Sequence, residues 1–209
     1  FSKVSKFSTL KSTAVYRQAV CADKLEDNKT AVKKYKYLMS HYPYSKLAVR
    51  AKYLYAQSLY EDKQAKRAKR EFKGLLKQYP NTDYAIASEY YLGSVEAGNI
   101  VNIKNKKNKE LAKNKAIHYF RDYLKEAPSG RFAILSIDKW IGLNKKLTNE
   151  DNLIIAKAYQ ASGDYKKAQK YLKFTNISVS WPYLVKNAYS LKDYSRVKYY
   201  TEQGLKGKG

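Results

Sequence analysis

Apolar residues recur along most of the chain at the spacing of an amphipathic helix. Ala51, Leu54 and Tyr55 occupy positions i, i+3 and i+4, and Ile117 and Phe120 lie three residues apart. Side chains at these intervals share one face of a helix. The pattern predicts about 11 helices of ordinary length. No segment shows the alternation of apolar and polar residues that predicts a convincing strand, so the chain is expected to be all-α.

The helices are predicted to come in repeated pairs. Residues 30–43 align with residues 67–80 at an offset of 37, and residues 115–128 follow the second copy at an offset of 48. The copies share an alanine, an aromatic residue and a final proline: Ala31, Ala68, Ala116; Tyr35, Phe72, Phe120; Pro43, Pro80, Pro128. Alanine lets helices approach closely, and proline cannot continue the helix that it ends. Stacked helix pairs bury a continuous core that no single pair could form.

Two shorter copies follow in the second half of the chain. Residues 156–168 and 185–197 share an Ala-Tyr step and an Asp-Tyr step, and Ser162-Gly163-Asp164 is predicted to be a turn. Thr148 to Asp151 resembles a capping box, in which a side chain at each end of the first turn accepts a backbone hydrogen bond. The polar segment Gly98–Lys109 holds the extra length of the third copy and is predicted to be an enlarged loop.

The copies divide into two blocks. Residues 1–142 are predicted to hold three helix pairs and one unpaired helix, which follows Pro128. Residues 143–209 are predicted to hold two further pairs, because Gly142–Leu147 interrupts the apolar pattern. A joint at this interruption and one continuous array are both compatible with the sequence.

The pairs resemble tetratricopeptide repeats, which implies a right-handed superhelix, an α-solenoid, of about five helix pairs plus one helix. The segments Y-P-Y-S-K-L-A from Tyr42 and Y-P-N-T-D-Y-A from Tyr79 resemble the subset found in bacterial envelope proteins. Two groups use it: the non-catalytic arm of soluble lytic transglycosylases and the lipoproteins of outer-membrane β-barrel assembly. Residues 147–172 and 180–189 are similar to the stretch that precedes the transglycosylase catalytic domain.

The resemblance implies a binding function in the cell envelope. The first hypothesis is the N-terminal arm of a lytic transglycosylase that positions peptidoglycan or partner proteins. The alternative is a free-standing envelope adaptor that binds peptide segments, and a third hypothesis is a cytoplasmic scaffold. None of the nine glutamates precedes a serine, as the acid/base glutamate of the transglycosylase domain does. The chain is therefore expected to be non-enzymatic, with no catalytic, cofactor-binding or metal-binding residues.

The charge balance adds an attraction for anions. The 209 residues include 42 Lys and Arg against 18 Asp and Glu, which gives a net charge of +24. Lysines outnumber arginines 35 to seven, and arginine is the residue that reads base edges in pairs of hydrogen bonds. Specific nucleic-acid binding is therefore not expected, whereas an anionic envelope polymer or a membrane surface would be attracted.

Two groups of residues are candidates for binding. Aromatic residues of the helical stripes would line a groove for a peptide or glycan, although such rings also fill repeat cores: Tyr53, Tyr60, Tyr84, Tyr91, Trp140, Tyr159, Trp181, Tyr189. Lysines of the predicted loop would contact anions: Lys104, Lys106, Lys107, Lys109. A run of this kind is also typical of a solvated connector.

The remaining features predict structure or location rather than chemistry. Cys21 has apolar neighbours in a helical pattern and is expected to be a small buried residue. The acidic pair Glu150-Asp151 is expected to cap a helix, because neighbouring residues of a helix point to different faces. The chain starts at Phe1 without a recognisable signal peptide, and is expected to be a mature or trimmed fragment of a periplasmic or envelope protein.

Overall fold

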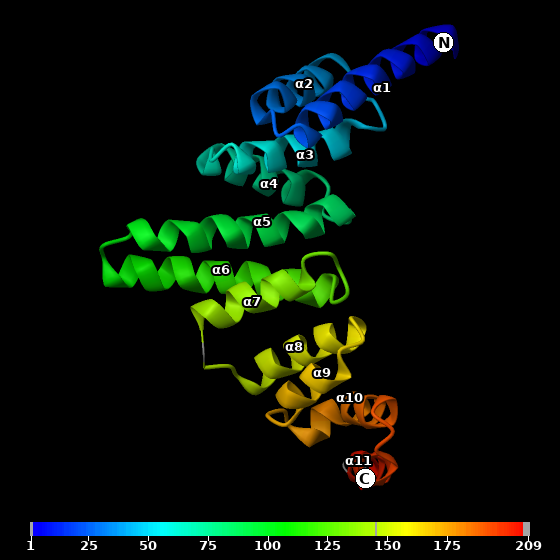
Figure 1. Ribbon diagram of the computed structural model, residues 1–209, viewed down its shortest axis with the longest axis vertical. Helices are drawn as coiled ribbons and strands as arrows, with labels where there is room; N and C mark the ends of the chain where they lie inside the picture. The colour runs from blue at the N-terminus through cyan, green and yellow to red at the C-terminus, as the bar shows by residue number, and fades with distance from the viewer. Residues whose placement is uncertain (1, 145, 207–209) are drawn as a thin grey trace. The chain divides into compact units, whose positions relative to one another are not determined.

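The computed structural model describes residues 2–144 and 146–206, with side chains from Ser8 onward. These residues form eleven α-helices and one 3₁₀ helix without a strand (Figure 1), which confirms the predicted all-α, tetratricopeptide-like fold class of an α-solenoid. In the described residues no helix is both long and apolar enough to cross a membrane.

The chain divides into two compact units between Gly98 and Asn99. Unit 1 holds α1 (Ser2–Lys24), α2 (Asn28–His41), α3 (Ala48–Glu61), α4 (Ala65–Gln78) and α5 (Asp83–Asn99). Unit 2 holds η1 (Ile100–Asn102), α6 (Lys106–Glu126), α7 (Ala133–Leu143), α8 (Asn149–Ala161), α9 (Tyr165–Leu172), α10 (Ile177–Ser190) and α11 (Tyr194–Lys206). The predicted boundary at residues 142–143 falls within unit 2, at the last residue of α7, and stays a prediction.

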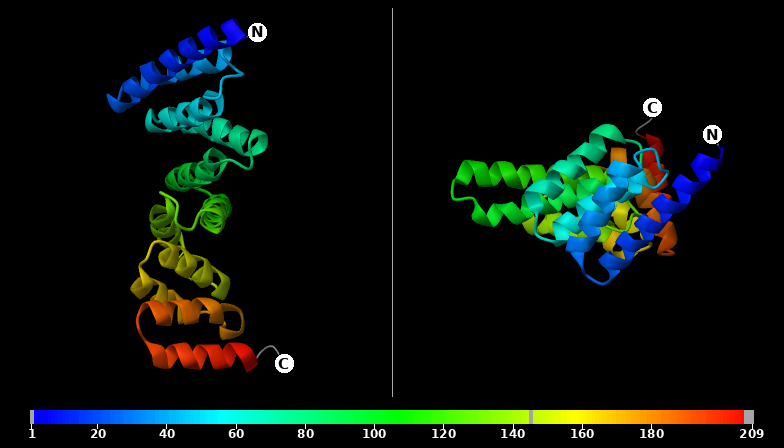
Figure 2. Two further views of the ribbon diagram at one scale, coloured as in Figure 1. Left: turned by 90° about the vertical axis from the view of Figure 1, so that its right-hand side faces the viewer. Right: turned by 90° about the horizontal axis from the view of Figure 1, so that it is seen from above.

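Within the units, consecutive helices form hairpins (Figure 2): α1 with α2, α3 with α4, α8 with α9, and α10 with α11. All four hairpins close through a residue with a positive φ, namely Glu26, Lys63, Gly163 and Lys192. In each turn the next residue donates its N–H to a carbonyl five residues back, at 2.8–3.0 Å. Only Gly163 adopts this backbone without a steric cost, so the other three turns are held by the packing of their helices.

The matched positions of the repeats form the core. Ala31, Ala68 and Ala116 are fully buried, and so are the aromatic residues that follow each of them. Where each second helix ends, a backbone N–H of Tyr42, Tyr79 or Ala127 donates to a carbonyl four residues back, at 2.8 Å. The three copies found in the sequence are therefore three copies of one packing geometry.

In the third copy, the turn after the proline is held by a different hydrogen bond. The Ser45 hydroxyl accepts from the N–H of Leu47 at 3.2 Å, but the equivalent N–H of Phe132 donates to the hydroxyl of Tyr123 at 3.0 Å. That hydroxyl lies where a Cβ on Gly130 would be, only 2.3 Å away. Glycine is required here because the Tyr123 hydroxyl takes the place of the serine hydroxyl.

Two local predictions are wrong and one is confirmed. The segment Gly98–Lys109 is largely helical, because α5 runs to Asn99, η1 follows, and Asn105 caps α6 by accepting from the N–H of Asn108 at 3.0 Å. Cys21 is exposed, and the buried side of this part of α1 is formed by its neighbours Ala19 and Ala22. The capping box of α8 is present, with Thr148 and Asp151 each accepting the other's backbone N–H.

Candidate functional site

Four of the eight candidate aromatic residues lie in the core. Tyr53 and Tyr91 in unit 1 and Trp140 and Tyr159 in unit 2 are all 5% exposed or less. The Tyr91 ring stacks on Phe72 with centroids 4.8 Å apart. Burial raises the pKa of Tyr159 to about 12, because the phenolate would lose its hydration. In this structure these four rings pack helices together and present no accessible surface for a ligand.

The other four aromatic candidates keep part of their surface. Tyr189 is 65% exposed and meets Tyr194 edge-on, at 6.2 Å between centroids. Tyr60 and Tyr84 are half-buried against the core rings of unit 1, with Tyr84 5.5 Å from Tyr53. Trp181 is half-buried beside Gly204. The structure therefore gathers the unit 1 candidates into one aromatic cluster, whereas those of unit 2 pack against separate partners.

A surface that the sequence did not single out crosses the first helices of unit 1. Its members are Tyr16 on α1, Arg50 on α3 and Tyr84 on α5, and we call it the first-helix face. The Arg50 guanidinium lies 5.4 Å from the centre of the Tyr16 ring. Burial raises the pKa of the Tyr16 hydroxyl, an effect that Arg50 opposes and Tyr84 adds to, so the three groups share one environment. These residues lie far apart in the sequence, and the packing of α1, α3 and α5 brings them into one environment.

The first-helix face has the chemistry of a protein-binding surface. Tyrosine supplies contact area at a low cost in side-chain entropy, together with a hydroxyl for backbone groups of a ligand. Arg50 is exposed and offers a planar array of donors that matches a carboxylate or a carbonyl. Because its guanidinium is held over the Tyr16 ring, less rotamer freedom is lost when a ligand binds.

A polar cleft of about 530 Å³ adjoins the first hairpin. It lies between the first half of α1 and the turn from α2 to α3, and Lys46, His41 and the fully exposed Tyr44 are among its lining residues. Hydroxyl groups dominate its wall, where Ser45 donates to Ser12 at 3.3 Å and Ser12 donates to the carbonyl of Thr9 at 3.0 Å. Such a wall can exchange hydrogen bonds with an extended peptide.

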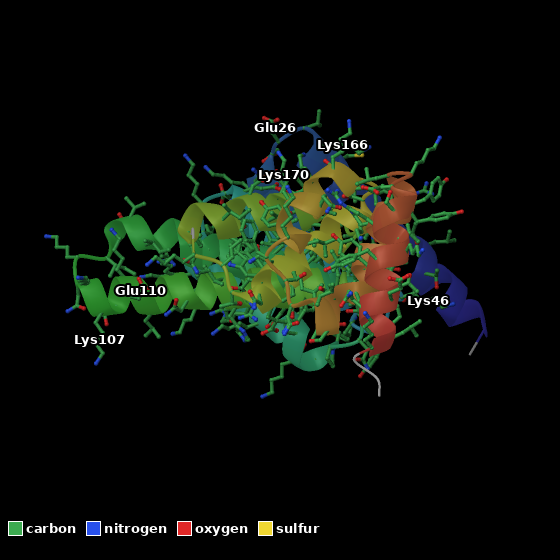
Figure 3. All side chains as sticks on the ribbon, turned by 90° about the horizontal axis from the view of Figure 1, so that it is seen from below. Glu26, Lys46, Lys107, Glu110, Lys166 and Lys170 are labelled. Carbon is green, nitrogen blue, oxygen red and sulfur yellow. The ribbon has the colours of Figure 1, made fainter. Side chains whose placement is uncertain are left out.

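The four candidate anion-contact residues are all exposed. Lys104 precedes α6, and Lys106, Lys107 and Lys109 lie in its first turn. Figure 3 shows Lys107 and Glu110 projecting from the free end of α6. The structure therefore keeps these lysines together and solvated, at the start of a helix rather than on a long loop.

Positive charge is concentrated on second helices. In α2 there are four lysines and no acidic residue, and α9 also has three lysines and no acid, with Lys166 and Lys170 on its surface in Figure 3. In contrast, the first helix α5 has Asp83, Glu89 and Glu96 and no basic residue. Non-specific attraction of anions is therefore weaker at α5 than at α2 or α9.

Comparisons with known proteins agree with this architecture. The chain is similar to a crystal structure of TTC0263, a thermophilic TPR protein from Thermus thermophilus, with a TM-score of 0.50 and 15% sequence identity over 86% of this chain and 98% of that one. At this identity the likeness concerns the fold alone. A search of curated protein sequences gave no match. The sequence model of the YfiO family, described as an outer membrane lipoprotein, matches residues 9–173. Because that match spans well over half of the chain, from α1 through α9, the chain belongs to the YfiO family.

Proposed function

We propose that this chain is a cell-envelope adaptor that binds extended segments of partner proteins on the first-helix face of unit 1. The observation that carries the proposal is the match of residues 9–173 to a family described as an outer membrane lipoprotein. The Tyr-Pro segments at Tyr42 and Tyr79 resemble the lipoproteins of outer-membrane β-barrel assembly, which bind proteins and catalyse no reaction. The proposal therefore places the chain among scaffolds and not enzymes.

The geometry of unit 1 supports a peptide as the ligand. Tyr16, Arg50 and Tyr84 come from three consecutive first helices, so a ligand that contacts all three must extend across the hairpins rather than along one helix. Extended segments expose backbone carbonyls, which Arg50 and the two phenols can bind as donors. The hydroxyl-lined cleft beside α1 offers further hydrogen bonds in the same unit.

The transglycosylase-arm hypothesis has weaker support. It depended on residues 147–172 and 180–189, which form α8, α9 and part of α10. The first stretch lies within the match to the YfiO family, and the second lies beyond it. Of the candidate rings of unit 2, Trp140 and Tyr159 are buried and Trp181 is half-buried beside Gly204, which leaves Tyr189 as the one exposed candidate ring of this unit for stacking on a sugar.

Site-specific photocrosslinking in the source bacterium tests the proposal. Benzoylphenylalanine is placed at Arg50 or Tyr84, and at Lys170 on α9 as the control. The expected result is a crosslink to a protein of the outer-membrane assembly machinery at the first two positions and not at the third. Equal crosslinking at all three positions, or a product confined to the cytoplasmic fraction, would overturn the adaptor function.

A binding assay with purified components separates protein from glycan as the ligand. The probes are a synthetic peptide of the crosslinked segment and purified peptidoglycan sacculi. Because arginines that become buried at interface centres are frequent hot spots, Arg50→Ala is expected to weaken peptide binding about ten-fold or more. Arg17→Ala is the matched control, since Arg17 is an exposed arginine on α1 outside the face. Salt-resistant binding of sacculi that falls with Arg50→Ala would favour the transglycosylase arm instead.

A further inference from the structure

The third repeat carries additional length, and the structure turns it into a projecting tip. Its matched residues follow the second copy by 48 positions instead of 37. The additional residues lengthen α6 to 21 residues, against 14 in each of α2 and α4, and add the 3₁₀ turn η1 before it. We call residues 99–111 of unit 2 the α6 tip. Neither the first-helix face nor the cleft includes it.

The α6 tip combines positive charge with exposed apolar side chains. Every residue from Lys104 to Leu111 is exposed, and so is Val101. Val101 is 84% exposed and Leu111 is 53% exposed. Four lysines lie in this segment, and its single acidic residue, Glu110, forms an ion pair with Lys113 at 3.5 Å. The lysines that face solvent at the tip therefore carry net positive charge.

Folding of unit 2 does not account for this combination. A solvated connector gains solubility from lysines, but it gains nothing from a valine and a leucine left in water. The first turns of α6 bury only Ala112, and the helix reaches its fully buried residues at Ala116 and Phe120. The exposed apolar residues of the tip are therefore not buried by unit 2 and can contact a binding partner.

We propose that the α6 tip docks on the surface of a bilayer that contains anionic phospholipids. Lysines bind headgroup phosphates while their stems lie along the apolar boundary, and Val101 enters the headgroup layer. Attraction to an anionic leaflet strengthens binding by roughly five-fold for each lysine near the surface. The inference rests on the proposed envelope location, which brings the chain close to such a surface.

The side chains of the tip favour lipid over other anionic partners. Single-stranded nucleic acid is gripped by aromatic rings on which bases stack, and residues 99–111 contain no aromatic side chain. Protein interfaces are depleted in lysine and enriched in arginine and aromatic residues. Lysine with isolated aliphatic residues is the composition that suits an interface of phosphates over hydrocarbon.

Vesicle flotation with the full chain tests the proposal. Vesicles of phosphatidylglycerol and phosphatidylethanolamine are compared with vesicles of phosphatidylcholine alone at 50 to 300 mM salt, roughly the range over which charges become screened. The tip variant replaces Lys104, Lys106, Lys107 and Lys109 by Gln, and its matched control replaces Lys33, Lys36, Lys66 and Lys73, which are exposed on α2 and α4. We expect the affinity for the anionic vesicles to fall by about 100-fold or more in the tip variant and by less than about ten-fold in the control.

A fluorescent probe locates the contact independently of total charge. Because Cys21 is exposed, it is first replaced by Ser, and an environment-sensitive dye is then attached at Val101→Cys or, as the control, at Tyr44→Cys. Both native side chains are highly exposed, so both dyes start in water. Anionic vesicles are expected to shift the emission to the blue at position 101 only.

The outcomes separate this proposal from the adaptor function. Equal losses in the tip and control variants, or dye shifts at both positions, would overturn docking by the α6 tip, because total charge would then explain binding. Stronger dependence on the tip lysines for sacculi or for an oligonucleotide than for vesicles would overturn lipid as the partner. Peptide binding that is lost with Arg50→Ala while vesicle binding persists concerns the first-helix face alone, and the reverse result concerns the tip alone.

Discussion

Units 1 and 2 use the same helical hairpins but join them with different side chains. In unit 1, rings from three successive helices meet, with Tyr53 on α3, Phe72 on α4 and Tyr91 on α5 within 6.2 Å of one another. In unit 2, Arg121 on α6 forms ion pairs with Glu150 and Asp151 at the start of α8, at 3.0 and 3.4 Å. Unit 1 is joined mainly by contacts between rings, and unit 2 is joined partly by charge.

The difference follows from the extra helix. In unit 1 the two copies follow one another at an offset of 37 residues, and rings of α3, α4 and α5 come into contact. In unit 2, α7 packs on α6 and precedes α8, and α6 reaches α8 through the long side chains of Arg121 and Lys125. A second polar joint lies further along, where Gln160 donates to the carbonyl of Tyr183 at 2.8 Å. Regular spacing permits an aromatic core, whereas an irregular junction depends on directed polar contacts.

The largest effect is expected from removing the central ring of unit 1. Phe72→Ala leaves a cavity among Tyr53, Tyr91 and their neighbours, which is expected to lower the free energy of unfolding by about 3–5 kcal/mol. Urea denaturation followed by circular dichroism measures the whole chain, whereas tryptophan fluorescence measures unit 2, which holds both tryptophans. The ellipticity midpoint should shift more than the fluorescence midpoint. Equal shifts would contradict the assignment of this cluster to unit 1 alone.

A smaller effect is expected from a carboxylate that joins three helices of unit 1. Asp23 on α1 accepts hydrogen bonds from the hydroxyls of Tyr35 on α2 and Ser58 on α3, both at 2.6 Å. Burial, with the Asp23 carboxylate beside it, raises the pKa of the fully buried Tyr35. Asp23→Ala leaves two buried hydroxyls without this acceptor and is expected to cost about 2–3 kcal/mol in urea denaturation.

Asp23→Asn is the matched control for that substitution. The amide keeps one acceptor oxygen, so it should retain part of the stability that Asp23→Ala loses. If the alanine and asparagine variants are both as stable as the parent, apolar packing alone holds the hairpins of unit 1 together, and the polar joint is unimportant there.

The last hairpin of unit 2 offers a test of close packing. A Cβ on Gly204 of α11 would lie 2.3 Å from Cδ2 of Trp181 on α10. Gly204→Ala is expected to displace the indole, to lower stability by about 1–3 kcal/mol, and to shift the tryptophan emission to the red. Gly142→Ala on α7 is the control, because nothing lies within 4 Å of its added Cβ. Removing glycine from that helix should raise stability by about 0.5–1 kcal/mol. Unchanged emission in Gly204→Ala would show that the indole does not pack on this glycine.

The sequence predicted the hairpins because their determinants are local. The spacing of Ala31, Tyr35 and Pro43 specifies a helix, its buried stripe and its end, and Thr148 with Asp151 specifies a start. The spacing of apolar residues identifies the apolar stripe of a helix but not the residues that cover it, because a stacked helix has neighbours on more than one side. For that reason Tyr53 and Trp140, predicted as groove candidates, are buried core residues, and Cys21, predicted to be buried, is exposed.

The first-helix face of unit 1 could not be predicted from the sequence for another reason. Tyr16, Arg50 and Tyr84 follow one another at intervals of 34 residues and fall on no common motif. Their proximity depends on how α1, α3 and α5 pack, which is a property of the folded unit. The lysines of residues 104–109 were found by composition alone, but their place on a helix end needed the capping by Asn105. Composition therefore predicted the cluster of lysines, and only the structure shows that the cluster lies at the start of α6.

The smallest effect is expected from the ionic joint of unit 2 and depends on pH. Hydrogen bonding from Lys125 and the charge of Arg121 lower the pKa of Glu150 below its ordinary value. A carboxylate whose pKa is lower in the folded state stabilises the fold above its unfolded pKa of about 4.3, and this contribution is lost as the pH falls through the folded pKa. Because the side chain is 61% exposed, the loss should stay below about 1 kcal/mol. This loss of stability is measured as the difference between the urea midpoints at pH 7 and pH 3.5, followed by tryptophan fluorescence. Glu150→Gln should make stability depend less on pH, whereas Glu202→Gln, at an exposed glutamate of α11, should leave the dependence unchanged. Identical pH profiles in both variants would contradict a contribution of the Glu150 charge to this joint.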